Sequence, residues 1–164
     1  MNSTQRKGFT LIEILIVVAI IAILASVVLV GLGPTQQAGR DARRISDLSE
    51  VQNGLELYYN ECGYYPGTKQ TGSSCGNFSE ISSWANLTTA LEGTTAIAIT
   101  SVPNDPTAGH NYQYGTNGTG SLYVLEATLE NPNNSAFTNY NGASFPTVTG
   151  VLSCTGTGDY CKTL

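Results

Sequence analysis

A single carboxylate, that of Glu13, stands in an otherwise apolar stretch near the start of the chain. This stretch covers residues 9–33, FTLIEILIVVAIIAILASVVLVGLG, and contains no other charged residue. A lone carboxylate inside a lipid bilayer costs roughly 2.5–3.5 kcal/mol on insertion scales. Because a membrane helix tolerates such a charge when a cationic partner is available, the sequence predicts that Glu13 has one.

Four cysteines form the second group of residues with chemistry of their own: Cys62, Cys75, Cys154 and Cys161. We favour the local pairing of Cys62 with Cys75 and of Cys154 with Cys161, in which a loop of about 15 residues is closed at a gain of ~3 kcal/mol. The alternative joins Cys62 or Cys75 to the tail and would fasten the C-terminus to the end of a helix. A zinc site is not expected, because there is no C-x-x-C motif and His110 is the sole histidine.

The composition argues against an enzyme and against a nucleic-acid-binding protein. The sequence has no G-x-S-x-G motif and no phosphate-binding glycine loop. Charged residues make up 12% of the chain and the net charge is −5, whereas nucleic-acid binding needs a basic face. We therefore expect neither catalysis nor nucleic-acid binding.

The apolar stretch 9–33 is long enough to span a membrane, for which a helix needs about 20 apolar residues. Arg6 and Lys7 precede it and few cations follow soon after, which places the N-terminus in the cytoplasm. The remainder of the chain then faces the periplasm or the cell exterior, where cysteines form disulfides.

Helical periodicity continues after Pro34, which with Gly31 marks a weak point in a continuous helix. The residues predicted to face a core are Ala38, Ala42, Ile45, Leu48, Val51 and Leu55. The residues predicted to face solvent are Arg40, Asp41, Arg43, Arg44, Asp47, Glu50 and Glu56. If residues 9–61 form one helix, it spans roughly 80 Å, so about half of it must project from a domain of this size.

The segment after this helix predicts a short helix and a few strands. Ser83 should cap a helix that buries Trp84, Leu87 and Leu91 and ends at Gly93. Strands are predicted over 94–100, around Tyr112 and Tyr114, over 122–130, and near 147–152 in a loop-rich tail. On strand 122–130, the residues expected to face the helix are Tyr123, Leu125, Ala127 and Leu129, and those expected to face water are Glu126, Thr128 and Glu130.

The residues G-F-T-L-I-E, from Gly8 to Glu13, follow a basic leader and resemble the processing signal of type IV pilins and pseudopilins. The resemblance implies that a prepilin peptidase cuts after Gly8 on the cytoplasmic side and that the new N-terminal Phe9 is N-methylated. An ordinary secretory signal carries its apolar segment before an A-x-A cleavage site and loses it. Here the apolar segment would be retained.

The middle of the chain resembles the major pseudopilin of type II secretion in the runs ELYYNECGYYP and VPNDPTAGHNYQY. It departs from that pattern at Thr107-Ala108, where the pseudopilin has Trp-Gly, and in its cysteine-bearing tail, which is more similar to a type IV pilin. The implied fold is α+β and type IV pilin-like. A long N-terminal helix, membrane-spanning in its first half, would pack against a small antiparallel β-sheet with a loop-rich C-terminal region. The implied segments are a cleaved leader (1–8), a transmembrane and filament-core half-helix (9–33), an amphipathic half-helix (34–61) and a globular head with a variable loop (62–164).

The resemblance implies a structural subunit of a type IV pilus-like filament, a pilin or a major pseudopilin. Its partners would be copies of itself, the prepilin peptidase, an inner-membrane assembly platform and membrane lipid. It would wait in the inner membrane with its head periplasmic or extracellular, and Glu13 would pair with the Phe9 amine of a neighbouring subunit during assembly. The alternatives are a membrane-tethered extracytoplasmic binding domain and an adhesin-like minor pilin. The machine served, for pili, secretion or DNA uptake, is left open.

The resemblance also implies a calcium ion near Asp105, together with Glu126 or Glu130 and loop carbonyl oxygens. The alternative for Asp105 is a turn that its own side chain caps. No other cofactor is expected.

Overall fold

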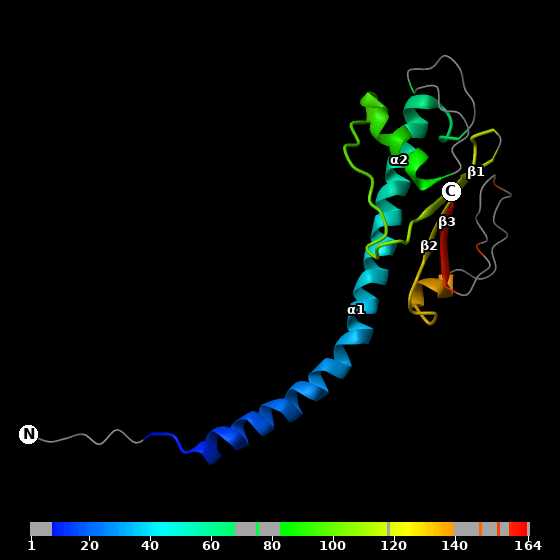
Figure 1. The fold of residues 1–164 in the computed structure, drawn as a ribbon. Helices are drawn as coiled ribbons and strands as arrows, with labels where there is room; N and C mark the ends of the chain where they lie inside the picture. The colour runs from blue at the N-terminus through cyan, green and yellow to red at the C-terminus, as the bar shows by residue number, and fades with distance from the viewer. Residues whose placement is uncertain are drawn as a thin grey trace, which may run out of the picture. The chain divides into compact units, whose positions relative to one another are not determined.

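The computed structural model describes residues 8–67, 75, 83–117, 119–139, 148, 154 and 158–163, apart from the side chains of residues 29–31. The chain divides into two compact units, Met1–Gln37 and Ala38–Leu164. We call the second unit the head. The elements in Figure 1 are α1 (Leu11–Cys62), α2 (Trp84–Gly93), the 3₁₀ helix η1 (Thr95–Ile97), β1 (Gln113–Thr116), β2 (Tyr123–Thr128), the 3₁₀ helix η2 (Ser135–Asn139) and β3 (Asp159–Thr163).

The helix α1 is 52 residues long and continues through Pro34, so the predicted weak point does not end it. A proline costs a helix one backbone hydrogen bond and crowds the preceding turn. The remaining hydrogen bonds and the long apolar run on the N-terminal side keep the helix continuous. Of the helices in the described part of the chain, α1 is the one long and apolar enough to cross a membrane.

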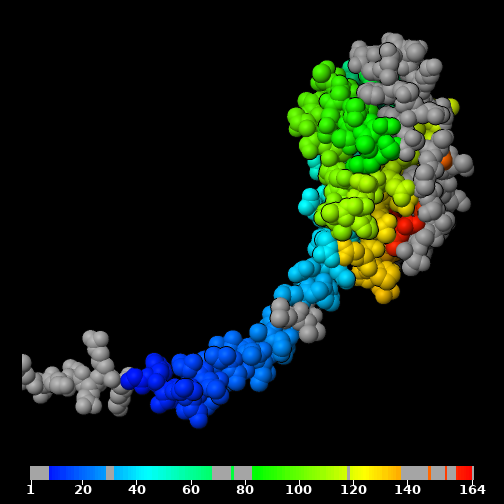
Figure 2. Space-filling model, viewed as in Figure 1, coloured from blue at the N-terminus to red at the C-terminus, as the bar shows by residue number. Residues whose placement is uncertain are grey.

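The head is built on the second half of α1, which buries Leu48, Val51, Leu55 and Tyr58. The helix α2 packs on the same core through Trp84, Leu87, Ala90 and Leu91, as its periodicity predicts. The hydroxyl of Ser83 accepts a hydrogen bond of 3.3 Å from the backbone N–H of Asn86, which is the predicted N-cap. In the space-filling view, α2 and the loop that follows it form one continuous part of the head surface (green in Figure 2).

The three strands form one antiparallel sheet in the order β1-β2-β3. Tyr114 of β1 lies opposite Leu125 of β2, and Glu126 of β2 lies opposite Cys161 of β3. The predicted core positions of β2 and the residue after it are buried: Tyr123, Leu125, Ala127 and Leu129. A long N-terminal helix with a small antiparallel sheet is the α+β, pilin-like arrangement that the sequence predicts, and the fold class is confirmed.

The strand predicted over 94–100 is wrong. This segment contains the 3₁₀ helix η1, and Ala98 behind it has a φ of 52°, in the left-handed region that an extended strand does not visit. The strand proposed over 147–152 lies outside the described residues, except for Val148, which is in no strand. The variable loop predicted after Cys62 also lies largely outside them. The strand β3 was not anticipated.

Glu126 was predicted to face water and instead is 3% exposed. The reason is the Cys154–Cys161 disulfide, which lies against this face of β2. The Glu126 carboxylate and the sulfur atoms of Cys154 and Cys161 lie within 4.8 Å of one another. The disulfide therefore covers Glu126 on the face of β2 that alternation alone assigns to solvent.

The core-facing side of α1 is also rotated from the predicted one in the first turns of the head. Asp41, Arg44 and Asp47 were predicted to face solvent and are buried, whereas Ala38 and Ala42 were predicted to face the core and are exposed. Steps of three and four residues lead from Asp41 and Arg44 directly to the apolar core positions that begin at Leu48. The buried stripe thus begins with an ion pair instead of with alanines.

Candidate processing and assembly site

The peptide bond between Gly8 and Phe9 lies outside the helix, which begins at Leu11. Both residues are exposed, Phe9 to 85%, and nothing lies within 4 Å of the place that a Cβ on Gly8 would occupy. The predicted cleavage position is therefore accessible from the solvent in the described part of the chain.

Thr10 and Glu13 together cap the start of α1. The backbone N–H and the hydroxyl of Thr10 donate to Oε2 of Glu13 at 2.8 and 2.7 Å, and the N–H of Glu13 donates to the Thr10 hydroxyl at 3.4 Å. This reciprocal pattern is a capping box, for which the sequence signal is T-x-x-E. Glu13 was predicted to be a functional residue and Thr10 was not, although the T-x-x-E pattern in the sequence is sufficient to predict the capping box.

The carboxylate of Glu13 is thus held by neutral donors of its own chain. None of the ion pairs among the described residues involves Glu13. Its predicted cationic partner, the amine of Phe9 in another copy, stays a prediction. The Glu13 carboxylate is thus oriented by Thr10 at the start of the helix and is exposed on the surface of the single chain.

The side chains before and after Glu13 form an apolar surface along the helix, in the part coloured blue in Figure 2. Each large apolar side chain of α1 that the structure describes in this unit is more than two-fifths exposed in the isolated chain: Leu11, Ile12, Ile14, Leu15, Ile16, Val17, Val18, Ile20, Ile21, Ile23, Leu24, Val27, Val28 and Leu32. A contiguous apolar surface of this size marks a membrane or protein interaction site.

A second cluster of charges lies in the head and centres on Arg44, whose side chain is 1% exposed. Its guanidinium donates to Asp105 from Nε and Nη2 at 2.8 and 3.0 Å, and to Asp41 and Glu130 from Nη1 at 2.9 Å each. Nη2 also donates to the hydroxyl of Thr107 at 2.9 Å. Hydrogen bonding to Asp105 raises the pKa of the Arg44 guanidinium further above its ordinary value.

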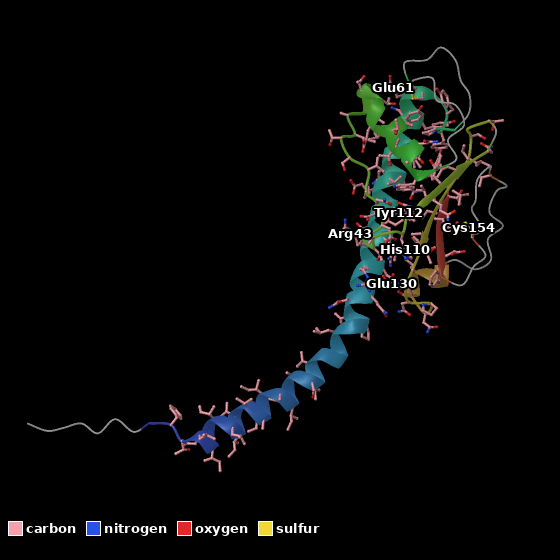
Figure 3. The ribbon with its side chains drawn as sticks, viewed as in Figure 1. Arg43, Glu61, His110, Tyr112, Glu130 and Cys154 are labelled. Carbon is pink, nitrogen blue, oxygen red and sulfur yellow. A yellow bond between two sulfur atoms is a disulfide. The ribbon has the colours of Figure 1, made fainter. Side chains whose placement is uncertain are left out.

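The carboxylates of this cluster have further donors. Asp41 accepts the backbone N–H groups of Glu130 at 2.8 Å and Asn131 at 3.0 Å. Glu130, labelled in Figure 3, also accepts from Nε of Arg40 at 2.6 Å. The hydrogen bond from Arg40, reinforced by those from Arg44, lowers the pKa of Glu130 to about 2.

The residues expected to bind calcium have these other roles. Both oxygens of Asp105 accept from Arg44, and Oδ1 also accepts the N–H of Thr107 at 2.7 Å, which is the predicted capped turn. Burial raises the pKa of Asp105, but the hydrogen bonds from Arg44 and Thr107 outweigh it, so the net shift is downward. Glu126 lies against a disulfide and Glu130 against two arginines. This donor set does not fit a calcium ion, because the carboxylates at Asp105 and Glu130 already bind cationic groups.

The disulfides in the structure follow the local pairing. One joins Cys62, the last residue of α1, to Cys75, and the other joins Cys154 to Cys161 of β3. The first fastens the C-terminal end of α1, and the second fastens the edge strand β3 and lies against Glu126.

The comparison with protein families matches residues 3–29 to the prokaryotic N-terminal methylation motif. The similar proteins are type II secretion system core proteins G. That of Pseudomonas aeruginosa is 32% identical over 139 residues, 77% of this chain and 87% of the relative. That of Escherichia coli is 35% identical over 66 residues, 40% of this chain and 46% of the relative. That of Aeromonas hydrophila is 33% identical over 70 residues, 43% of this chain and 49% of the relative.

The chain thus spans about half the length of several of these relatives and most of the length of the one from Pseudomonas aeruginosa. No solved structure gives a significant match to the chain. The match over most of the Pseudomonas protein, the methylation motif at the N-terminus and the long exposed helix agree with one another. This chain belongs to the family of type II secretion system core protein G, the major pseudopilins.

Proposed function

We propose that the chain is a structural subunit of a pilus-like filament in a type II secretion system, with a structural and not a catalytic role. The observation that carries this proposal is the N-terminal methylation motif over residues 3–29, which continues into the part of α1 whose apolar side chains are exposed. The names of the relatives supply the choice of secretion over a pilus or DNA uptake.

The proposed life of the subunit begins in the inner membrane. Residues 9–33 span the bilayer, the N-terminus is cytoplasmic, and the head lies on the opposite side. A prepilin peptidase removes residues 1–8, and Phe9 receives a methyl group on its new amine. The subunit then leaves the bilayer with the help of an inner-membrane assembly platform.

In the filament, the apolar surface of α1 contacts the same surface of other copies in place of lipid. This exchange costs little hydrophobic free energy, because both environments are apolar and exclude water. Assembly changes the environment of two charged groups, the Glu13 carboxylate and the Phe9 amine. The carboxylate of Glu13, held by Thr10 in the single chain, gains the Phe9 amine of a neighbouring copy. The pairing sets the axial register of the helices.

The test replaces Glu13 by Gln, which keeps the size and polarity of the side chain and removes its charge. Cleavage after Gly8 should continue, so the intact mass of the variant should show loss of residues 1–8 and one added methyl. The yield of filament should fall at least tenfold at equal membrane levels, because an uncharged amide does not attract the amine. The matched control is Glu61→Gln, an exposed glutamate near the other end of α1, which should assemble normally (labelled in Figure 3).

Normal filament yield from Glu13→Gln would contradict the charge pairing and leave the processing intact. An uncleaved N-terminus in the wild-type membrane protein would contradict the filament proposal itself and favour a tethered extracytoplasmic domain. Measuring mass and filament yield on the same samples separates the two results.

A further inference from the structure

The major-pseudopilin resemblance implies a calcium ion in the head, and the described residues around Asp105 do not fit one. The carboxylates of Asp41, Asp105 and Glu130 converge from three segments that are far apart in the sequence. Arg44 lies at the point where they meet. A side chain therefore holds the position that a metal ion would take among such ligands.

The hydrogen bonding of Arg44 is complete. A guanidinium has five N–H donors, and five bonds to Asp41, Asp105, Thr107 and Glu130 account for them. Each partner is an oxygen, as the ligands of calcium are. The guanidinium thus provides the connections that a bound ion makes through its coordination shell, to three carboxylates and a hydroxyl.

Arginines also offset most of the negative charge of the three carboxylates. Arg40 pairs with Glu130 in addition to Arg44, so two guanidinium groups face the three carboxylates. Two positive charges are what one divalent cation would supply. Calcium entering this cluster would have to displace a buried guanidinium and leave it without its carboxylates, which is strongly unfavourable.

The cluster connects three segments of the head that neither disulfide joins. Asp41 and Arg44 belong to α1, Asp105 and Thr107 to the turn before β1, and Glu130 to the segment after β2. The backbone N–H groups of Glu130 and Asn131 bind Asp41, so that segment is fixed by its main chain too. Loss of the central cation would release the turn from α1 and would leave the end of β2 held by Asp41 and Arg40.

We propose that the junction of α1, the 105–107 turn and the end of β2 binds no divalent cation, because the Arg44 guanidinium takes the central position among its carboxylates and holds the three segments together. The proposal concerns the head and does not depend on filament assembly. It assigns Arg44 a positioning role that only this geometry reveals, since the sequence pattern assigns it to solvent.

The test measures the melting temperature of the full chain in detergent micelles, followed by the fluorescence of Trp84. This is the sole tryptophan, and it is 6% exposed in the core of the head. The wild type should melt at the same temperature, within about 1 °C, in millimolar calcium chloride and in excess chelator. Arg44→Gln should lower the melting temperature by about 10 °C or more, because breaking a buried pair leaves carboxylates without a partner. Arg43→Gln is the matched control, since the Arg43 side chain is 62% exposed, and should shift it by less than 2 °C.

If Arg44→Gln yields no folded head, Arg44→Lys replaces it in the comparison. A lysine keeps the charge but not the five-donor fork, so a melting temperature below that of the wild type by more than the shift of Arg43→Gln supports the proposal. Two results would overturn it. One is a rise in the wild-type melting temperature with calcium that Asp105→Asn removes. The other is an Arg44→Gln variant that melts like Arg43→Gln.

Discussion

The carboxylates of Glu13 and Glu130 differ in the groups that hold them. Glu13 has only Thr10 as a donor among the described residues. Glu130 is held by the guanidinium groups of Arg40 and Arg44 within the same chain. We propose that the first changes partners on assembly, whereas the second stabilises the folded head.

The lowered pKa of Glu130 predicts acid sensitivity of the head. The folded-state value of about 2 lies below the ordinary value of 4.5, so the unfolded chain binds a proton first as the pH falls. The stabilisation is fully present above about pH 4.5 and is lost as the pH falls from there towards 2. The melting temperature, measured by Trp84 fluorescence, should therefore fall steeply between about pH 4.5 and pH 2.

The variant Glu130→Gln should melt at a lower temperature than the wild type at pH 7 and lose less on acidification, because it no longer contributes a titrating carboxylate. Glu61→Gln is the control and should follow the wild-type profile. If the melting temperature of Glu130→Gln falls as steeply with decreasing pH as that of the wild type, other carboxylates cause the acid sensitivity of the head. Asp105, whose pKa is also lowered, is one of them.

Among the elements, α1 is one continuous helix whose first part is apolar and exposed and whose second part packs in the core of the head. Its first part exposes apolar side chains on all sides, which suits lipid or other helices. Its second part has a buried stripe that begins with Asp41 and Arg44 and continues with Leu48, Val51 and Leu55. Pro34 is close to the division between the two units at Gln37 and Ala38, and the helix passes through it.

The helix α2 gives a direct test of the packing of the head. Leu87 is fully buried, so Leu87→Ala should destabilise the head by about 2–5 kcal/mol through lost burial and the cavity that remains. Thr89 lies two positions further on the exposed face of the same helix, and Thr89→Ala should change the stability by less than about 0.5 kcal/mol. Denaturant unfolding followed by Trp84 fluorescence measures both. Equal effects of the two substitutions would mean that α2 does not pack on the core as described.

For the whole molecule, the division at Gln37 and Ala38 predicts that the head is separable from the apolar part of α1. A chain that begins at Gln36 should be soluble and monomeric in size-exclusion chromatography, because it lacks the exposed apolar run and keeps the core. It should show no reactive thiol after unfolding without reductant, since both disulfides lie in the head. Aggregation of this chain, or two or more free thiols per molecule, would contradict the prediction.

The sequence alone determined the features that depend on local order. The Gly8–Phe9 processing signal, the continuous apolar run and the Ser83-capped helix with its buried Leu87 each rest on neighbouring residues and a period of 3.6. The α+β class and the family followed from the same local runs. These features could be predicted because each is carried by residues within a few turns of one another.

The tertiary structure decided which polar residues are inside. The helical period assigns Arg44 to solvent, and the alternation of the strand assigns Glu126 to solvent, yet both residues are buried. Arg44 is buried because Asp105 and Glu130, 61 and 86 residues further along the chain, supply carboxylates. Pairing with these carboxylates offsets the free-energy cost of removing the guanidinium from water. Glu126 is buried because the Cys154–Cys161 disulfide, from the far end of the chain, lies against its carboxylate. A local pattern contains no information about a partner at that separation, and so the charge cluster of the head became visible only when the chain was folded.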